Sequence, residues 1–211
     1  MIDSTLDRNK EIKLSNLQII YCIFKRILDI LVSIIGVIIS IPIIILFAII
    51  IKLEDGGPVF YKQERLGEKN KRFYIYKLRS MKVNAEKIGG AQWAKQNDNR
   101  ITNIGRFIRK TRIDELPQLV NILKGDMSLI GPRPERPELT YEFEKCIPGF
   151  SNRLAIKPGL TGWAQVNGGY DITPKEKLIL DIEYINNMGI LIDIKIIMKT
   201  IYVILTGHGA R

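Results

Sequence analysis

The sequence contains a single histidine, His208, close to the C-terminus, and two cysteines. This scarcity excludes a Ser-His-Asp triad and a metal site built from several histidines. Cys22 and Cys146 are far apart and show no metal-ligand spacing, so we expect reduced thiols in a cytosol-facing protein. Any acid–base or nucleophilic chemistry therefore falls to carboxylates, lysine or tyrosine.

The sequence also lacks internal repeats, low-complexity segments and a small-residue cleavage site near its start. We expect residues 1–24 to form a polar N-terminal lead-in. Acidic residues are few: 22 against 32 lysines and arginines, which gives a net charge of +10 and a pI near 9.6. This excess predicts an anionic partner, such as nucleic acid, anionic lipid or a phosphorylated substrate.

One uncharged apolar run covers residues 30–51 and is long enough to cross a bilayer. A transmembrane helix is the default interpretation. Pro42 near the middle kinks a helix, however, and both flanks are basic, so a spanning helix would put one basic flank on the wrong side. We therefore favour a re-entrant segment over residues 25–54 that breaks at Pro42 and returns to the same face.

Residues 55–211 are expected to form one domain with helices at the membrane interface. Alternation predicts a β-hairpin over residues 59–82, and apolar spacing predicts helices over 101–110, 174–188 and 190–205. Residues 83–100 are expected to be a polar loop, and Asn167-Gly168 predicts a hairpin turn. The predicted fold class is α+β: a small membrane-associated domain with a re-entrant N-terminal helix broken at a proline, amphipathic interfacial helices and a short sheet.

Charged residues concentrate between positions 106 and 136, where cations precede the acid pair Asp114–Glu115 and the turn GPRP (131–134) follows. Asp114 has two interpretations. It is an ordinary N-cap of the following helix, or one carboxylate of a site that holds a metal ion and phosphates. Arg133 lies between two prolines, and such a rigid frame suits an arginine that is aimed at a phosphate.

The hairpin carries aromatic residues beside cations, which indicates either a stacking platform for single-stranded nucleic acid or a half-buried strand. A basic membrane-tethered nucleic-acid-binding module is therefore the alternative function. Lys77 and Arg79 project to the same side of the second strand, where they face either a diphosphate or solvent.

Six strings then point to one family. They are Lys25-Arg26 before the apolar run, GPVFYKQERLG (57–67), KLRSM (77–81), RKTRIDELPQLVNILKGDMSLIGPRP (109–134), KPGLTGWAQVNG (157–168) and LDIEYINN (180–187). In this order they resemble the bacterial monotopic phosphoglycosyl transferases, also called initiating sugar transferases. The resemblance covers residues 25–206 and is to the minimal catalytic form.

The resemblance implies transfer of a sugar-1-phosphate from a UDP-sugar to undecaprenyl phosphate, with release of UMP, at the start of capsule, exopolysaccharide, O-antigen or glycoprotein assembly. It implies Mg²⁺ as cofactor, Asp114 as nucleophile and metal ligand, and Glu115 as its catalytic partner. The expected phosphate-binding residues are Lys77, Arg79, Arg109, Arg112 and Arg133.

The resemblance also implies a monotopic protein of the bacterial inner membrane, with residues 55–211 as its cytosol-facing catalytic domain. Its expected partners are lipid and the two substrates, with no nucleic acid. Amphipathic surfaces are compatible with a homodimer, and the sequence leaves both the oligomeric state and the sugar open. Asn70 replaces a glycine often found in the family's hairpin loop, and it tolerates a left-handed conformation.

Overall fold

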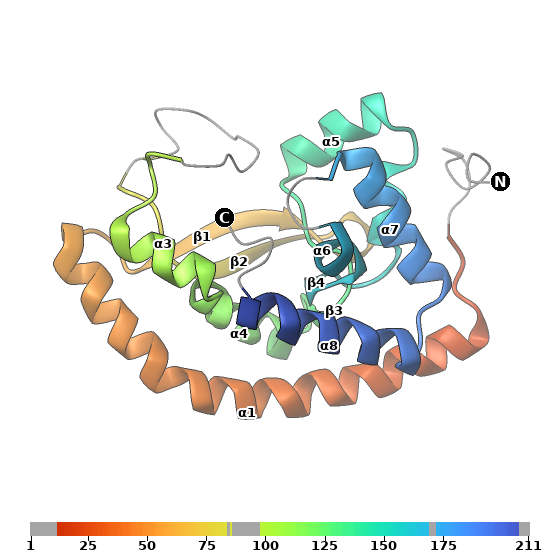
Figure 1. Ribbon diagram of the computed structural model, residues 1–211. Coiled ribbons are helices and arrows are strands. Elements are labelled where there is room, and N and C mark those ends of the chain that lie inside the picture. Colours follow the sequence, from red (N-terminus) through yellow and green to blue (C-terminus); the bar gives the residue numbers. More distant parts are fainter. Residues whose placement is uncertain (1–11, 84, 86–97, 169–171, 207–211) are drawn as a thin grey trace.

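The computed structural model describes residues 12–83, 85, 98–168 and 172–206. A long helix, α1 (Asn16–Asp55), forms an arc beneath the other elements, which comprise shorter helices and two small two-stranded sheets (Figure 1). The predicted α+β class is therefore confirmed. Most of residues 83–100, the predicted polar loop, lie outside the described residues.

Helix α1 begins earlier than the sequence pattern indicates. Ser15 and Gln18 form a capping box at its start, with each side chain bonded to the other's backbone. The last part of the predicted lead-in is thus helical, and residues 1–11 lie outside the described residues.

The helical backbone of α1 is continuous through Pro42, so the predicted break at this proline is wrong. The helix is instead curved along its length (Figure 1). A proline removes one hydrogen bond, and the ladder on either side persists. The hydroxyl of Ser40 bonds back to the carbonyl of Val37 at 3.1 Å, a contact that favours bending. The re-entrant path concerns the membrane and stays a prediction.

Both ends of α1 are fixed to the rest of the molecule. Near its start, Gln18 donates to the carbonyl of Ile185 at 2.7 Å, and the Lys25 ammonium lies 2.7 Å from the Asp193 carboxylate. Near its end, Asp55 forms an ion pair with Arg79. The helix therefore follows the domain instead of projecting from it (Figure 1).

The predicted hairpin is confirmed as β1 (Phe60–Leu66) and β2 (Arg72–Leu78), which pair antiparallel with Phe60 opposite Leu78. The short 3₁₀ helix η2 (Glu68–Asn70) joins them, and Asn70 adopts a left-handed φ of 61° as expected. On β2, Phe73 and Ile75 are buried against Leu119 and Ile122 of helix α4 (Leu119–Lys124).

Four elements carry the acid pair and its surroundings. Helix α3 (Asn103–Lys110) confirms the predicted amphipathic helix, and η3 (Ile113–Gln118), α4 (Leu119–Lys124) and β3 (Ser128–Ile130) follow. Strand β3 pairs parallel with β4 (Gly159–Thr161). This pairing holds residues 131–134, which directly follow β3, so that Arg133 reaches Glu115.

The remaining helices form the second half of the domain. They are α5 (Pro137–Cys146), η4 (Phe150–Ala155), α6 (Trp163–Gly168), α7 (Pro174–Asn186) and α8 (Ile190–Thr206). The apolar face predicted for α7 is confirmed, because Leu178, Ile182 and Ile185 are buried in the largest core cluster. Asn167 and Gly168 are the last two residues of α6, so the predicted hairpin turn is wrong. The Asn167 side chain donates to the carbonyl of Trp163, one turn earlier in the helix, at 2.8 Å.

Among the described helices, α1 is long and apolar enough to cross a membrane. Its most apolar 18-residue stretch has a mean hydropathy of 3.3, and only 11% of that stretch is buried. Its isoleucines and leucines are mostly exposed, as are Ile194, Ile197 and Met198 on α8. An exposed apolar surface of this extent suits contact with lipid.

Candidate active site

The acid pair lies at the start of the 3₁₀ helix η3, between α3 and α4. Asp114 is 6% exposed and Glu115 is 7% exposed. Arg112 occupies the N-cap position with a left-handed φ of 60°, and no side chain caps the helix. The interpretation of Asp114 as an N-cap is therefore wrong: the aspartate lies inside the helical turn, and its carboxylate is available for another role.

Glu115 is held by two cations from distant parts of the sequence. The Lys77 ammonium, on β2, lies 2.7 Å from its Oε1, and the guanidinium of Arg133 bonds to the same carboxylate. Burial alone would raise the pKa of Glu115, but Arg133, Lys77 and Arg112 outweigh it and hold the pKa well below its usual range. Glu115 is thus a permanent anion that fixes two phosphate-binding candidates in place.

Asp114 has the opposite environment. Burial raises the pKa of this carboxyl to about 6, and the neighbouring charge of Glu115 adds to the rise, although Lys77 opposes it. Among the residues that the structure describes, no hydrogen bond or ion pair reaches its carboxylate. An aspartate that is desolvated, unpartnered and close to cations is more nucleophilic than one held in a salt bridge.

Two further predicted cations act on the pair electrostatically. Arg109 of α3 and Arg112 both favour the ionised form of Asp114, and Arg112 also favours that of Glu115. The structure therefore brings Lys77, Arg109, Arg112 and Arg133 together around the pair.

Arg79 is the predicted site residue that has a different partner. Its guanidinium pairs with Asp55 at the end of α1, and the residue is 7% exposed. The phosphate-binding role predicted for Arg79 stays untested, whereas its role as a link between α1 and β2 is visible.

Sequence reasoning missed several buried polar residues that support the site. Asn121 of α4 is fully buried, donates to the carbonyl of Tyr74 at 2.7 Å and accepts from the N–H of Tyr76 at 3.2 Å. Arg153 and Asp181 form an ion pair, and Arg153 also donates to the carbonyl of Arg133 in the turn at residues 131–134, called the Arg133 turn below. One signal was present: Asp181 interrupts the apolar face of α7, and an acidic residue there predicts a buried partner.

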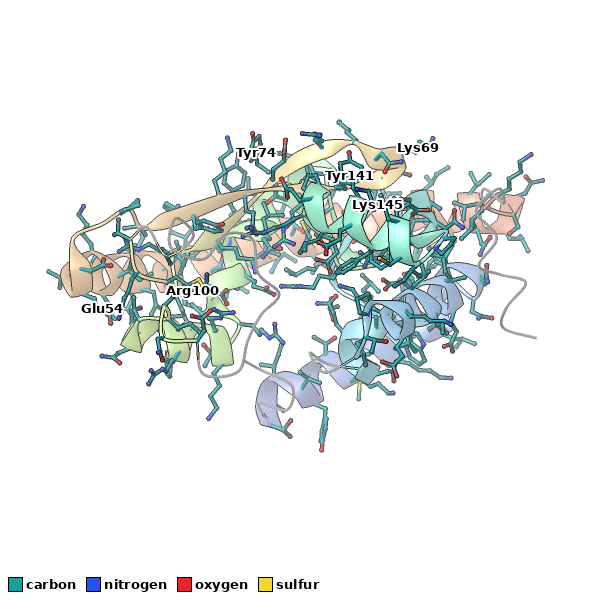
Figure 2. All side chains as sticks on the ribbon, turned by 90° about the horizontal axis from the view of Figure 1, so that it is seen from above. Glu54, Lys69, Tyr74, Arg100, Tyr141 and Lys145 are labelled. Carbon is teal, nitrogen blue, oxygen red and sulfur yellow. The ribbon has the colours of Figure 1, made fainter. Side chains whose placement is uncertain are left out.

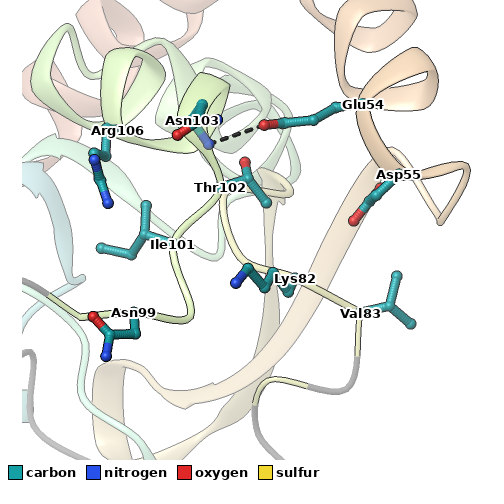
Figure 3. A pocket seen from close by; sticks show the side chains of 9 residues that line it. All are labelled: Glu54, Asp55, Lys82, Val83, Asn99, Ile101, Thr102, Asn103 and Arg106. Carbon is teal, nitrogen blue, oxygen red and sulfur yellow. Dashed lines mark hydrogen bonds between the residues drawn. The ribbon is translucent and has the colours of Figure 1, made fainter.

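A separate cavity of about 700 Å³ lies at the end of α1, between this helix and α3. Glu54 points across it and accepts hydrogen bonds from the backbone N–H groups of Asn103 and Ile104, at the positive end of α3 (Figure 3). Figure 2 shows Glu54 and Arg100 at this end of the molecule, far from Tyr141 and Lys145 on α5. None of the cavity's described lining residues belongs to the acid pair or its ion-pair partners.

The hairpin gives little support to a nucleic-acid platform. Phe73 is 6% exposed, and the Lys62 ammonium lies 3.8 Å from the ring centroid of Tyr74. The buried Phe73 fits a half-buried strand, whereas Phe60 and Tyr74 are exposed.

Comparison with known sequences gives an independent result. The model for the family described as "Bacterial sugar transferase" matches residues 20–207. This chain belongs to that family. The match contains most of α1, the acid pair and the turn at residues 131–134 that carries Arg133, and it confirms the resemblance to initiating sugar transferases.

Three curated relatives illustrate the match. An Aeromonas hydrophila protein named UDP-N-acetylgalactosamine-undecaprenyl-phosphate N-acetylgalactosaminephosphotransferase is 47% identical, over 91% of this chain and 46% of its own length. A Xanthomonas campestris UDP-glucose:undecaprenyl-phosphate glucose-1-phosphate transferase is 38% identical, over 85% of this chain and 38% of its own. An uncharacterized sugar transferase of Bacillus subtilis, EpsL, is 40% identical over 90% of this chain and 91% of its own length.

The chain thus spans less than half of the length of the longer relatives and nearly all of EpsL. The names of the longer relatives also differ in the sugar that they specify.

Proposed function

We propose that this chain transfers a sugar-1-phosphate from a UDP-sugar to undecaprenyl phosphate and releases UMP. The observation that carries the proposal is the buried, unpartnered carboxylate of Asp114 among several cations. Phosphoryl transfer requires chiefly positioning and neutralisation of charge, which this arrangement supplies.

The chemistry proceeds in two displacements. A carboxylate oxygen of Asp114 attacks the phosphorus that bears the sugar, the bond from that phosphorus to the bridging oxygen breaks, and UMP leaves with the electron pair. An oxygen of undecaprenyl phosphate then attacks the aspartyl phospho-sugar, which frees Asp114 and forms the diphosphate. A carboxylate nucleophile suits this sequence because acyl phosphates transfer readily to a second acceptor.

Lys77 and Arg133 are placed to bind phosphate oxygens while Glu115 orients them. Asp114 also fits Mg²⁺, because its carboxylate has no partner in the described part of the chain and Mg²⁺ favours one or two carboxylates together with phosphate and water. Among the described residues, no three acidic, histidine or cysteine side chains are grouped so that they could hold a metal ion by themselves. Substrate phosphate and water would therefore supply the other ligands of the Mg²⁺. When bound, Mg²⁺ would neutralise charge on the diphosphate.

The membrane arrangement is part of the proposal. Both ends of α1 contact the same domain, which supports a monotopic helix that enters and leaves on the cytosolic face of the bacterial inner membrane. A lipid-linked acceptor then reaches Asp114 from the membrane side, and the anionic membrane surface matches the basic charge of the chain.

The product would be the first lipid-linked intermediate of a capsule, exopolysaccharide, O-antigen or glycoprotein. The sugar is best found by screening UDP-sugars for UMP release, beginning with UDP-N-acetylgalactosamine because the Aeromonas relative carries that name.

The test uses purified protein in detergent with undecaprenyl phosphate, Mg²⁺ and each UDP-sugar. We expect UMP release from the wild type and a loss of at least about a thousandfold in Asp114→Asn, since the nucleophile is absent. Asp126→Asn, which removes a half-buried carboxylate just after α4, is the matched control and should keep wild-type turnover.

Mass spectrometry addresses the intermediate directly. With acceptor withheld, the wild-type mass should rise by one phospho-sugar, and the Asp114→Asn mass should not. Wild-type turnover in Asp114→Asn would overturn the proposal.

A further inference from the structure

The segment that carries Arg133, residues 132–135, is fixed by its backbone from several directions. Each of its four carbonyl oxygens accepts a hydrogen bond from a different residue. The donors are the N–H of Gly159 to Pro132 (3.0 Å), Arg153 Nη2 to Arg133 (2.7 Å), Arg65 Nη1 to Pro134 (3.0 Å) and the N–H of Leu66 to Glu135 (3.0 Å). From this anchored backbone the Arg133 side chain reaches Glu115.

The donor to the Arg133 carbonyl is itself almost completely buried. Arg153 and Asp181 are each 1% exposed, and Arg153 Nε and Nη2 lie 2.9 and 2.6 Å from Asp181 Oδ2. The guanidinium also lies 5.2 Å from the ring centroid of Phe150. Asp181 therefore sets the direction of Arg153, and Arg153 in turn bonds the Arg133 carbonyl.

Stability alone does not explain this pair. Two charges taken out of water lose hydration that their attraction often fails to recover, and apolar residues of similar volume commonly serve as well or better. Burial in fact raises the pKa of Asp181 despite the adjacent Arg153. Arg153 Nη2 bonds the Arg133 carbonyl as well as Asp181, so this energetically costly pair is suited to holding Arg133 in place.

Helix α7 supplies a second connection to the same segment. Lys177, one turn before Asp181, forms a buried ion pair with Glu135, which also lies 3.6 Å from Arg65. The face of α7 that carries Lys177 and Asp181 is thus the support for the Arg133 turn.

We propose that Arg153 and Asp181 are positioning residues that hold the Arg133 backbone so that its guanidinium stays on Glu115 and the substrate phosphate. The catalytic part of this inference rests on the proposed function. A displacement of about 1 Å at such a group can cost about a hundredfold in rate, so support behind the turn has a direct effect on turnover.

The test replaces the pair together, as Arg153→Met with Asp181→Leu, so that no buried charge is left alone. We expect little change in the thermal midpoint, because removing two buried charges offsets the lost hydrogen bond to the Arg133 carbonyl. Turnover should be lower by about ten- to a hundredfold, and amide exchange should be faster in a peptide covering residues 131–136. In an Arg133→Ala background the same double substitution should have no further effect on turnover, because the residue that it positions is gone.

A matched control is the buried pair that joins α1 to α8, changed as Lys25→Met with Asp193→Asn. It should leave the exchange of residues 131–136 unchanged. If the main double variant does not fold, Arg153→Lys serves instead. The lysine side chain ends one atom short of Nη2, the nitrogen that bonds both Asp181 and the Arg133 carbonyl, so turnover should still fall.

Wild-type turnover and wild-type exchange in these variants would overturn the inference. If the wild type itself releases no UMP while amide exchange at residues 131–136 still rises in the double variant, the proposed function is wrong. The inference that Arg153 and Asp181 hold the Arg133 backbone is then still supported.

Discussion

At the scale of single residues, the main feature of this protein is that two adjacent carboxylates have opposite environments. Asp114 is desolvated without a partner, and its pKa is raised, whereas Glu115 is clamped by two cations, and its pKa is lowered. Paired acids whose pKa values are pushed apart take different roles. This supports Asp114 as the group that reacts and Glu115 as the group that organises.

The raised pKa of Asp114 predicts how activity and stability depend on pH. Turnover should rise as pH increases through about 6, because only the ionised aspartate is a nucleophile. Stability should change in the opposite sense: a folded-state pKa above the unfolded value of 3.8 means that the native protein binds more protons, so stability falls as pH rises from about 4 to above 6.

Asp114→Asn removes this penalty and should be more stable than the wild type at pH 8, by about 1–3 kcal/mol, although inactive. The two proteins should differ less at pH 4. Thermal unfolding of the wild type and Asp114→Asn at pH 4 and pH 8 checks the effect on stability. A pH profile of UMP release by the wild type checks the effect on turnover. An asparagine variant that is less stable at pH 8 would show that the buried carboxylate is compensated by a partner.

Arg133→Lys tests whether geometry matters beyond charge. The Arg133 guanidinium contacts both oxygens of Glu115, which a lysine ammonium cannot reproduce. We expect turnover to fall by about ten- to a hundredfold with little change in thermal midpoint. The exposed Arg72→Lys, at the edge of the hairpin, is the control; equal turnover in both variants would show that charge alone suffices.

At the scale of elements, the site depends on how β2 and α4 are joined. Asn121 bonds the backbone of β2 on both sides of Ile75, and β2 delivers Lys77 to Glu115. A single buried amide therefore sets the register between the strand that carries one cation and the helix that follows the acid pair.

Asn121→Leu should destabilise the protein by about 1–3 kcal/mol, because a backbone donor and acceptor of β2 lose their partner in a buried setting. Turnover should fall as well, since Lys77 is displaced. Asn186→Leu, on the exposed end of α7, should stay within about 0.5 kcal/mol of the wild type. Denaturant melts of the two variants give the comparison, and equal midpoints would contradict the role of Asn121.

At the scale of the whole molecule, α1 and the domain form one unit. Gln18 near its start and Asp55 at its end both bond to the same domain, which supports the proposed monotopic arrangement over a helix with its two ends on opposite sides of the bilayer. The curvature of α1 lets the helix follow this surface (Figure 1), and most of its isoleucines and leucines are exposed.

Cysteine labelling in intact cells tests this arrangement. In a Cys22→Ser, Cys146→Ser background, single cysteines at Lys13 and Lys145, both exposed, should be shielded from a membrane-impermeant reagent and react only after permeabilisation. If only the cysteine at position 13 is labelled in intact cells, α1 crosses the membrane and the monotopic arrangement is wrong.

Much of the fold was predictable from local sequence patterns. Apolar spacing identified α3, α7 and α8, alternation identified the hairpin, and the basic flanks with Pro42 indicated an unusual membrane segment. Segments 167–168 and 113–118 were not predictable in the same way. Asn167-Gly168 is a turn signal that tertiary packing overrode, and the spacing after Asp114 does not distinguish a 3₁₀ turn from the start of an α-helix.

The sequence by itself determined the chemistry that is available: carboxylates and cations instead of histidine or cysteine, an apolar helix, and amphipathic elements, because these depend on composition and on neighbours a few positions apart. Only the tertiary structure decided the pairing of charges. Lys77 and Arg133 meet Glu115 across 38 and 18 positions, and Arg79 pairs with Asp55 across 24. Such contacts follow from how strands and helices pack, which sequence spacing does not record.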